Sequence, residues 1–221
     1  DVRLSRGLGD VYKRQYEAFI GHQLGSIPAP DAAGKPDWDR YNNEGWTYAD
    51  HFLTPFLAAL KQIGVTPRLL PNLEAYRSGK FSSAARIACD QPDAVREIIE
   101  RVSGRELPES WFPWQPLDSN GSLDGLTVTG YEFPLVHWTD QHGKSGSSNI
   151  EKGEGKLPWR LDWPAKWGFN AITCEPFGKD HGAAGGSYDT GKELAVLFGH
   201  QPPVPLTYEW ISLRGEGAMS S

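Results

Sequence analysis

The sequence predicts an α/β fold in which a parallel sheet is built through a strand–helix–strand unit. Three observations carry this prediction. Residues 171–175 have the composition of a short strand, residues 187–199 have the pattern of a helix, and residues 206–213 form a second strand. A glycine-rich loop joins the first strand to the helix. This order makes a βαβ unit, which implies parallel strands with ligands at their carboxyl ends.

The N-terminal segment is set apart from this prediction. Residues 1–15 show no clear period and resemble a translated adapter sequence, so we expect them to be non-native. Glycine and proline punctuate residues 16–45, which indicates loops. The only methionine is Met219, so the chain has no initiator at its start, and we expect a fragment of a longer protein.

A first amphipathic helix is predicted over residues 47–63. Thr47 with Asp50 offers an N-terminal cap, and Gly64 offers a stop. Pro55 should kink this helix or mark its first turn. The apolar side chains keep the spacing of one buried face, and they are Phe52, Leu53, Phe56, Leu57, Leu60 and Ile63.

The middle of the chain predicts short helices after a short strand. Residues 65–70 are the strand candidate, and residues 72–104 are helical in pieces. Pro92 should begin the last of these helices, which runs to Gly104.

A small antiparallel patch is predicted next. Residues 123–138 alternate or cluster residues that favour strands. Residues 139–156 are polar and rich in glycine, which predicts a mobile loop.

Composition gives no support to several classes of function, and any surface for RNA would have to be local or lie elsewhere. The net charge of −6 provides no electrostatic footprint for nucleic acid, and no apolar run approaches the roughly 18 residues of a membrane span. There is no apolar stretch typical of a signal peptide. Cys89 and Cys174 stand alone, which favours reduced thiols in a cytosolic protein. No cysteine or histidine pairs stand at ligand spacing, so we expect no metal site.

The glycine-rich loop of the βαβ unit is a candidate ligand site. Gly178, Gly185 and Gly186 would let the backbone approach a ligand, and Asp180 could accept hydrogen bonds from ribose hydroxyls. Such a loop is also common as a plain turn. Tyr208 in the second strand could belong to the core or could present its hydroxyl at the strand end.

Three tryptophans precede that unit. Trp159, Trp163 and Trp167 have a spacing of four, which places them on one face if the segment is helical. They could line a pocket or simply pack in the core. Pro158 and Pro164 argue against one continuous helix.

Five short motifs follow one another from residue 157 onwards. They are Leu161-Asp-Trp-Pro-Ala-Lys-Trp167, Glu175-Pro-Phe-Gly-Lys-Asp-His181, Gly185-Gly-Ser-Tyr-Asp-Thr-Gly191, Tyr208-Glu-Trp210 and Ala218-Met-Ser-Ser221. In this order they resemble the second half of the active site of the class I lysyl-tRNA synthetases. The last motif resembles the start of the KMSKS-type loop of that family. A looser resemblance reaches back to Tyr16 through Ile27-Pro-Ala-Pro-Asp31, His51-Phe52 and Tyr76-Arg-Ser-Gly-Lys-Phe81.

The sequence also departs from the family pattern. The HIGH-type signature is absent, the KMSKS-type loop breaks off before its lysine, and no anticodon-binding domain is present. Some archaeal-type relatives carry a zinc-binding knuckle in the inserted region. Here residues 115–150 contain His137 and His142 but no cysteine, so we predict no zinc.

The resemblance implies a fold and a reaction. The fold is a Rossmann-type catalytic domain made by residues 16–65 and 157–221, with residues 66–156 as an inserted, mostly helical connective region. The reaction is activation of lysine by ATP, normally with Mg²⁺, followed by transfer of lysine to its tRNA in the cytoplasm. No membrane or DNA partner is expected.

The resemblance also implies residue roles. The residues that would hold the ribose of ATP are Gly178, Asp180, Gly185 and Gly186. The residues that would begin the loop over the ATP phosphates, and so act in catalysis, are Met219, Ser220 and Ser221. The residues that would line the lysine pocket are Trp159, His181 and Tyr208. The ammonium of lysine needs a buried acceptor, for which Asp162 and Glu209 are candidates.

Two alternatives remain open on the sequence alone. The first is a class I synthetase for another amino acid, such as glutamate. The second is a non-catalytic, tryptophan-rich binding module, for instance for carbohydrate, which would have an all-β pattern with exposed tryptophans.

Overall fold

The computed structural model describes residues 15–209, which form two compact units. The first unit contains residues 75–118 and 125–209, and the second contains residues 15–74 and 119–124. The segment predicted to be non-native lies, apart from its last residue, outside the described part of the chain.

The second unit is built around a small aromatic core. Tyr16, Ile27 and Tyr48 are buried in it, with the rings of Tyr16 and Tyr48 5.0 Å apart. The Tyr16 hydroxyl donates a hydrogen bond to the carbonyl of Pro28, at 3.0 Å. The elements of this unit are η1 (Glu17–Phe19), η2 (Leu24–Ser26), α2 (Trp38–Glu44) and α3 (Tyr48–Gln62).

Helix α3 confirms the predicted cap. The backbone N–H of Asp50 donates to the Thr47 hydroxyl at 3.2 Å, and the N–H of Thr47 donates to the Asp50 carboxylate at 3.0 Å. Pro55 lies inside the helix, so it does not mark the first turn. The predicted buried face is wrong, because only Tyr48 is buried in this helix and Phe56 is 58% exposed.

The strand predicted over residues 65–70 is also wrong. This segment carries no regular element in the structure. A strand needs a partner for its backbone hydrogen bonds, and the described sheets pair only other segments. The strand-favouring composition of residues 65–70 was therefore not sufficient to predict a strand.

The helical pieces of the middle region are confirmed. They are α4 (Asn72–Arg77), α5 (Ser82–Asp90) and α6 (Pro92–Ser103). Pro92 stands in the first turn of α6, where its missing N–H costs no hydrogen bond. Gly104 ends α6 with a φ of 65°, and its N–H donates to the carbonyl of Glu100. This left-handed conformation favours glycine.

The predicted antiparallel patch is a three-stranded sheet. Its strands are β2 (Leu126–Glu132), β3 (Leu135–Asp140) and β4 (Ser145–Asn149), in the order β2-β3-β4. A second small sheet pairs β1 (Gln115–Pro116) with β5 (Gly155–Lys156).

The mobile loop predicted for residues 139–156 is therefore wrong. That segment supplies β4, the 3-10 helix η3 (Ile150–Lys152) and β5. Its small side chains suit close packing, because a Cβ added at Gly146 would come within 2.4 Å of the Trp138 ring. The serines and glycines that suggested a loop instead allow β4 to lie directly against an indole.

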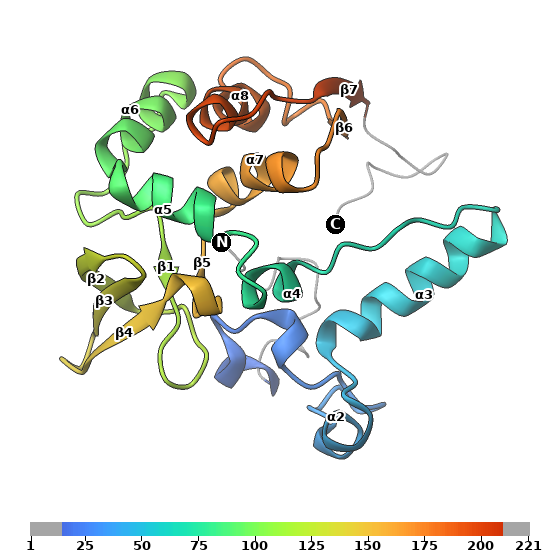
Figure 1. Ribbon diagram of the computed structural model, residues 1–221. Coiled ribbons are helices and arrows are strands. Elements are labelled where there is room, and N and C mark those ends of the chain that lie inside the picture. Colours follow the sequence, from blue (N-terminus) through green and yellow to red (C-terminus); the bar gives the residue numbers. More distant parts are fainter. Residues whose placement is uncertain (1–14, 210–221) are drawn as a thin grey trace. The chain divides into compact units, whose positions relative to one another are not determined.

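The C-terminal part confirms the βαβ unit. Strand β6 (Cys174–Gly178) and strand β7 (Val204–Tyr208) pair in parallel, and α8 (Ser187–Leu197) connects them (Figure 1). The first strand begins three residues later than predicted. Residues 170–173 instead turn at the end of the preceding helix, where the N–H of Ile172 donates to the carbonyl of Trp167 at 2.9 Å.

Helix α7 (Trp159–Phe169) corrects the prediction drawn from its prolines. Pro158 precedes the first turn, and Pro164 lies within one continuous helix. Leu161 is fully buried in α7, and Ala165 and Trp167 are 3% and 2% exposed. Burial of such side chains is worth about 1.5–3 kcal/mol each, which offsets the roughly 3 kcal/mol cost of an interior proline.

The main core of the first unit lies where α5, α6 and α7 meet the β-sheets. Trp114, Val136 and Leu157 are at its centre, each 1% exposed or less. Helices of this kind are at odds with the all-β binding module considered above. Within residues 15–209, no helix has the length and apolar character needed to span a membrane.

Candidate active site

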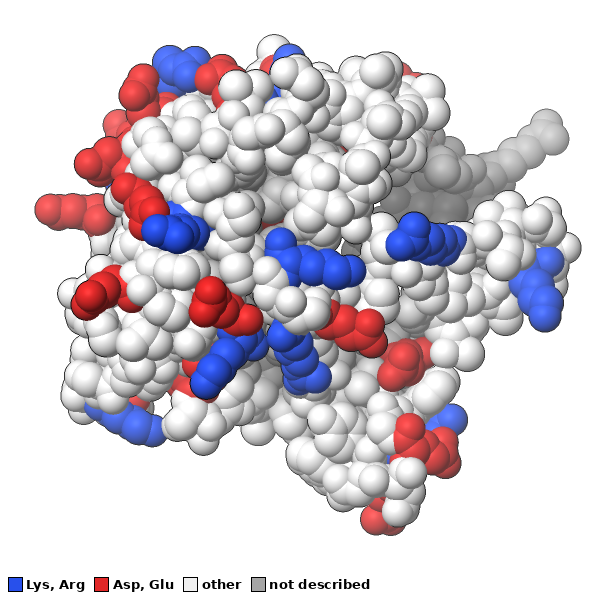
Figure 2. Space-filling view, viewed as in Figure 1, with Lys and Arg blue, Asp and Glu red and all other residues white. Residues whose placement is uncertain are grey.

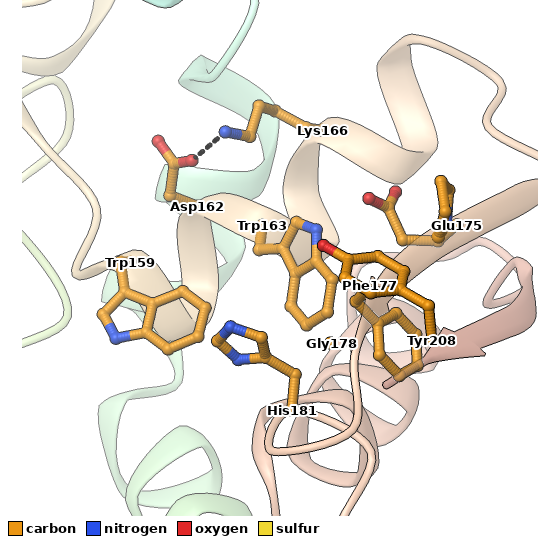
Figure 3. A pocket seen from close by; sticks show the side chains of 10 residues that line it. Trp159, Asp162, Trp163, Lys166, Glu175, Phe177, Gly178, His181 and Tyr208 are labelled. Carbon is orange, nitrogen blue, oxygen red and sulfur yellow. Dashed lines mark ion pairs between the residues drawn. The ribbon is translucent and has the colours of Figure 1, made fainter. Parts of the chain in front are cut away.

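A pocket of about 370 Å³ lies beside the βαβ unit, at the carboxyl ends of β6 and β7 (Figure 3). Helix α7 forms one side, and the two strands with the loop after β6 form the other. The lining residues are Trp159, Asp162, Trp163, Lys166, Glu175, Pro176, Phe177, Gly178, His181 and Tyr208.

Aromatic rings form a wall of the pocket. The His181 ring lies 5.6 Å from Trp159 and 5.9 Å from Trp163, and Figure 3 shows it directed toward both indoles. Phe177 meets Trp163 edge-on at 5.6 Å. Trp159 is 41% exposed, so one indole is available to a ligand. Aromatic faces attract cations and pack well on an alkyl stem.

An ion pair lies on the α7 side. The Lys166 ammonium is 2.7 Å from Oδ1 of Asp162, one helical turn away. The other carboxylate oxygen, Oδ2, accepts a hydrogen bond of 2.7 Å from the Tyr76 hydroxyl. The Tyr76 hydroxyl in turn accepts one of 3.0 Å from the N–H of Leu157. Burial, with the adjacent Asp162 charge, raises the pKa of Tyr76 well above its usual value.

A second carboxylate lies on the strand side. Glu175 is half-buried on β6, and its Oε2 accepts a hydrogen bond of 2.9 Å from the indole N–H of Trp167. Trp167 itself is 2% exposed. A Cβ added at Gly191 on α8 would come within 2.7 Å of the Trp167 ring, so glycine allows α8 to lie against the indole.

The loop after β6 is fixed by its own backbone. The N–H of Lys179 donates to the carbonyl of Tyr208, and the N–H of Tyr188 donates to the carbonyl of His181. Gly186 stands just before α8, where a Cβ would come within 2.6 Å of two carbonyl oxygens. The loop therefore brings glycine backbone to the N-terminus of a helix, a place that favours anionic ligands.

A carboxylate on α8 also holds this loop. The N–H of Gly185 donates to Asp189 at 3.0 Å, and Gly185 has a φ of 72°. Hydrogen bonding to Lys192 and to this N–H lowers the pKa of Asp189, against a smaller opposing effect of burial.

The structure brings part of the predicted site together. The predicted lysine-pocket residues Trp159, His181 and Tyr208 line one pocket with Gly178. The other predicted ATP-site residues, which do not line it, are Asp180, Gly185 and Gly186 in the adjoining loop. The predicted catalytic residues Met219, Ser220 and Ser221 lie outside the described residues.

The two candidate acceptors for an ammonium are placed differently. Asp162 lines the pocket, but both of its oxygens already have partners. Glu209 does not line the pocket; its side chain is 78% exposed and pairs with Lys179. Sequence reasoning did not propose Glu175 and Lys166 for the pocket, although both stand inside the motifs that carried the resemblance.

Comparison of the sequence with known protein families identifies the family of this chain. A sequence model described as "tRNA synthetases class I (K)" matches residues 5–221. The chain belongs to this family of class I tRNA synthetases. The resemblance inferred from the five motifs is thereby confirmed.

Relatives of this class I synthetase chain have a consistent name. It is 41% identical over 210 residues to the lysine–tRNA ligase of Thermoplasma acidophilum, which covers 94% of this chain and 39% of the relative. It is 41% identical over 209 residues to that of Archaeoglobus fulgidus, with 94% and 40% covered. It is 45% identical over 210 residues to that of Methanosarcina barkeri, with 93% and 37% covered. The chain thus spans about two fifths of the length of these relatives.

No group of three histidine, cysteine or acidic side chains within residues 15–209 is arranged to hold a metal ion. Cys89 is buried and Cys174 is exposed, and both are free thiols. The absence of zinc stays a prediction, which elemental analysis of protein prepared in metal-free buffer would test.

Proposed function

We propose that this chain is part of a lysine–tRNA ligase that activates lysine with ATP and transfers it to tRNA(Lys). One observation carries the proposal: Trp159, His181 and Tyr208 line a single pocket at the carboxyl ends of two parallel strands. Ligands of open α/β sheets bind at that edge. The names of the relatives support lysine as the amino acid.

The proposed reaction needs positioning more than covalent help from the protein. The carboxylate of lysine attacks the α-phosphorus of ATP, the bond to the bridging oxygen breaks, and pyrophosphate leaves. A hydroxyl at the 3′ end of the tRNA then attacks the carbonyl carbon of the adenylate, and AMP leaves. Pocket walls that fix the lysine stem hold its carboxylate in line for the first step.

The ATP site is proposed for the loop between β6 and α8. Gly178 ends β6, Gly185 and Gly186 directly precede α8, and the exposed side chain of Asp180 would accept hydrogen bonds from the ribose hydroxyls. Mg²⁺ would neutralise phosphate charge when ATP is bound.

The larger architecture is proposed from the same unit. The parallel pair β6 and β7 with α8 would be part of a Rossmann-type sheet, with residues 66–156 as the connective insertion. Residues 75–118 nevertheless pack in one unit with residues 125–209. Met219, Ser220 and Ser221 would begin the loop over the phosphates.

Recognition of tRNA is proposed for the whole protein in the cytoplasm. The net charge of this chain is −6. Figure 2 shows both basic and acidic side chains on the face that it presents. Backbone phosphates of RNA are bound mainly by clustered basic side chains. We therefore assign most of the RNA contacts to parts of the protein beyond this chain.

Lysine-dependent exchange between ATP and pyrophosphate tests the proposal. We expect a chain completed to the length of its relatives to show it with lysine and not with glutamate. Alanine at Trp159, His181 or Tyr208 should raise the KM for lysine by about 10- to 100-fold, and that for ATP much less, because one pocket contact is worth about 1–3 kcal/mol.

Trp38→Ala provides a matched control. Trp38 is 51% exposed, comparable to Trp159, but belongs to the second unit. It should leave both KM values unchanged. Equal effects of Trp159→Ala on lysine and ATP would instead indicate a structural role. The 221-residue chain, which spans about two fifths of the length of its relatives, should by itself show exchange near background.

A further inference from the structure

The pocket contains three charged side chains that are not equivalent. Asp162 is 8% exposed and has a partner on each carboxylate oxygen, the Lys166 ammonium and the Tyr76 hydroxyl. Figure 3 shows the ion pair on the α7 side of the pocket. The charges of Asp162 and Lys166 therefore compensate each other before any ligand enters.

Glu175 is the carboxylate that remains. Glu175 makes no ion pair within residues 15–209. Its one side-chain hydrogen bond within these residues is accepted by Oε2 from the indole N–H of Trp167. Oε1 is left for a further donor. Counting Asp162, Lys166 and Glu175, the pocket carries one uncompensated negative charge, which matches a ligand with one ammonium on an alkyl stem.

We propose that Glu175 binds the side-chain ammonium of the amino-acid substrate and that Trp167 is the positioning residue for its carboxylate. This inference rests on the proposed function, because it names the acceptor that a lysine pocket requires. It replaces both acceptors considered from the sequence. Asp162 is occupied by resident donors, and Glu209 is exposed and paired with Lys179.

The surroundings of Glu175 suit that role. A charged hydrogen bond is stronger in a half-buried site than in water, and an uncharged substrate of the same shape would leave the carboxylate unpaired. Trp167 is rigid, because it is 2% exposed and α8 packs against it at Gly191. Its N–H fixes one oxygen of Glu175 and so limits the positions of the other.

The experiment compares lysine with norleucine, which has a methyl group in place of the ammonium. In the completed chain, Glu175→Gln should raise the KM for lysine by about 10- to 100-fold, since hydrogen bonds to charged groups are the stronger ones. The inhibition constant of norleucine against lysine should change less than about threefold. The KM for ATP should also stay constant.

Glu209→Gln is the matched control and should leave all three constants unchanged. Trp167→Phe should raise the KM for lysine by a smaller factor and leave the inhibition constant of norleucine near its original value. Far-ultraviolet circular dichroism and thermal melting of each variant identify loss of the fold.

Two outcomes would overturn the assignment. Equal weakening of lysine and norleucine by Glu175→Gln would show that Glu175 only shapes the pocket. An unchanged KM for lysine in that variant would show that the ammonium binds elsewhere. Absence of lysine-dependent exchange in the unsubstituted protein would overturn the proposed function together with this inference, and is distinguishable from both.

Discussion

Helices α3 and α7 share a sequence pattern but have opposite surroundings. Each has apolar residues spaced for one face and a proline in its interior. In α7, Leu161 is fully buried and Trp167 is 2% exposed, whereas in α3 Phe52 is 48% and Phe56 is 58% exposed. An amphipathic pattern predicts which side chains share a face. It does not predict what covers that face.

The difference matters for the site. The buried face of α7 anchors the helix in the main core, so its opposite side can hold Trp159, Asp162 and Lys166 at one wall of the pocket. Helix α3 is held in its own unit mainly by Tyr48 and by its N-terminal cap. Substitutions in the two helices should therefore have very different effects on the free energy of unfolding.

The largest effect is expected for Leu161→Ala. The side chain is fully buried among the residues of the main core, so its truncation leaves a cavity. The free energy of unfolding should fall by about 2–5 kcal/mol, measured by urea denaturation. Leu53→Ala in α3 is the matched control, with 38% exposure and an expected loss below about 1 kcal/mol. Equal losses would contradict the contrast between the two helices.

Tyr76→Phe should come next. It removes the hydroxyl that joins Asp162 to the N–H of Leu157, and both groups are then left buried with one partner fewer. A loss of about 1–3 kcal/mol is expected in the same assay. Tyr131→Phe removes a comparable hydrogen bond to Asp90 at an exposed position and should cost less. If the two substitutions lower the free energy of unfolding equally, burial does not explain the contribution of the Tyr76 hydroxyl to stability.

Thr47→Ala should have a smaller effect. It deletes the side-chain half of the capping box of α3 and leaves the N–H of Asp50 to water. The expected loss is about 1 kcal/mol. Helix content by circular dichroism should fall slightly with it. Thr47→Ser keeps the hydroxyl and should restore most of the loss, and failure to do so would point to packing of the threonine methyl group.

The smallest effect is expected for Phe56→Ala. Its ring is more than half exposed, so truncation removes few contacts. The free energy of unfolding of this chain should change by less than about 0.5–1 kcal/mol. A loss as large as that of Leu161→Ala would show that the apolar face of α3 is covered in solution.

Local signals determined much of what the sequence could predict. The cap at Thr47, the helix start at Pro92 and the stop at Gly104 were all confirmed. Each depends on the φ preference or the hydrogen bonds of residues only a few positions apart. The strand–helix–strand order of the βαβ unit was also confirmed, although its two strands pair distant residues such as Cys174 and Val204, and this order brought Trp159, His181 and Tyr208 into one pocket.

Tertiary structure decided the rest, because the decisive partners are distant in sequence. Pro164 is tolerated since α7 is buried in a core that no local rule reveals. One oxygen of Asp162 is occupied by a hydrogen bond from Tyr76, 86 residues away. That bond and the Lys166 pair occupy Asp162 and leave Glu175 available. A sequence shows which side chains can carry charge and which lie one helical turn apart, but only packing shows which carboxylate oxygens already have distant hydrogen-bond donors.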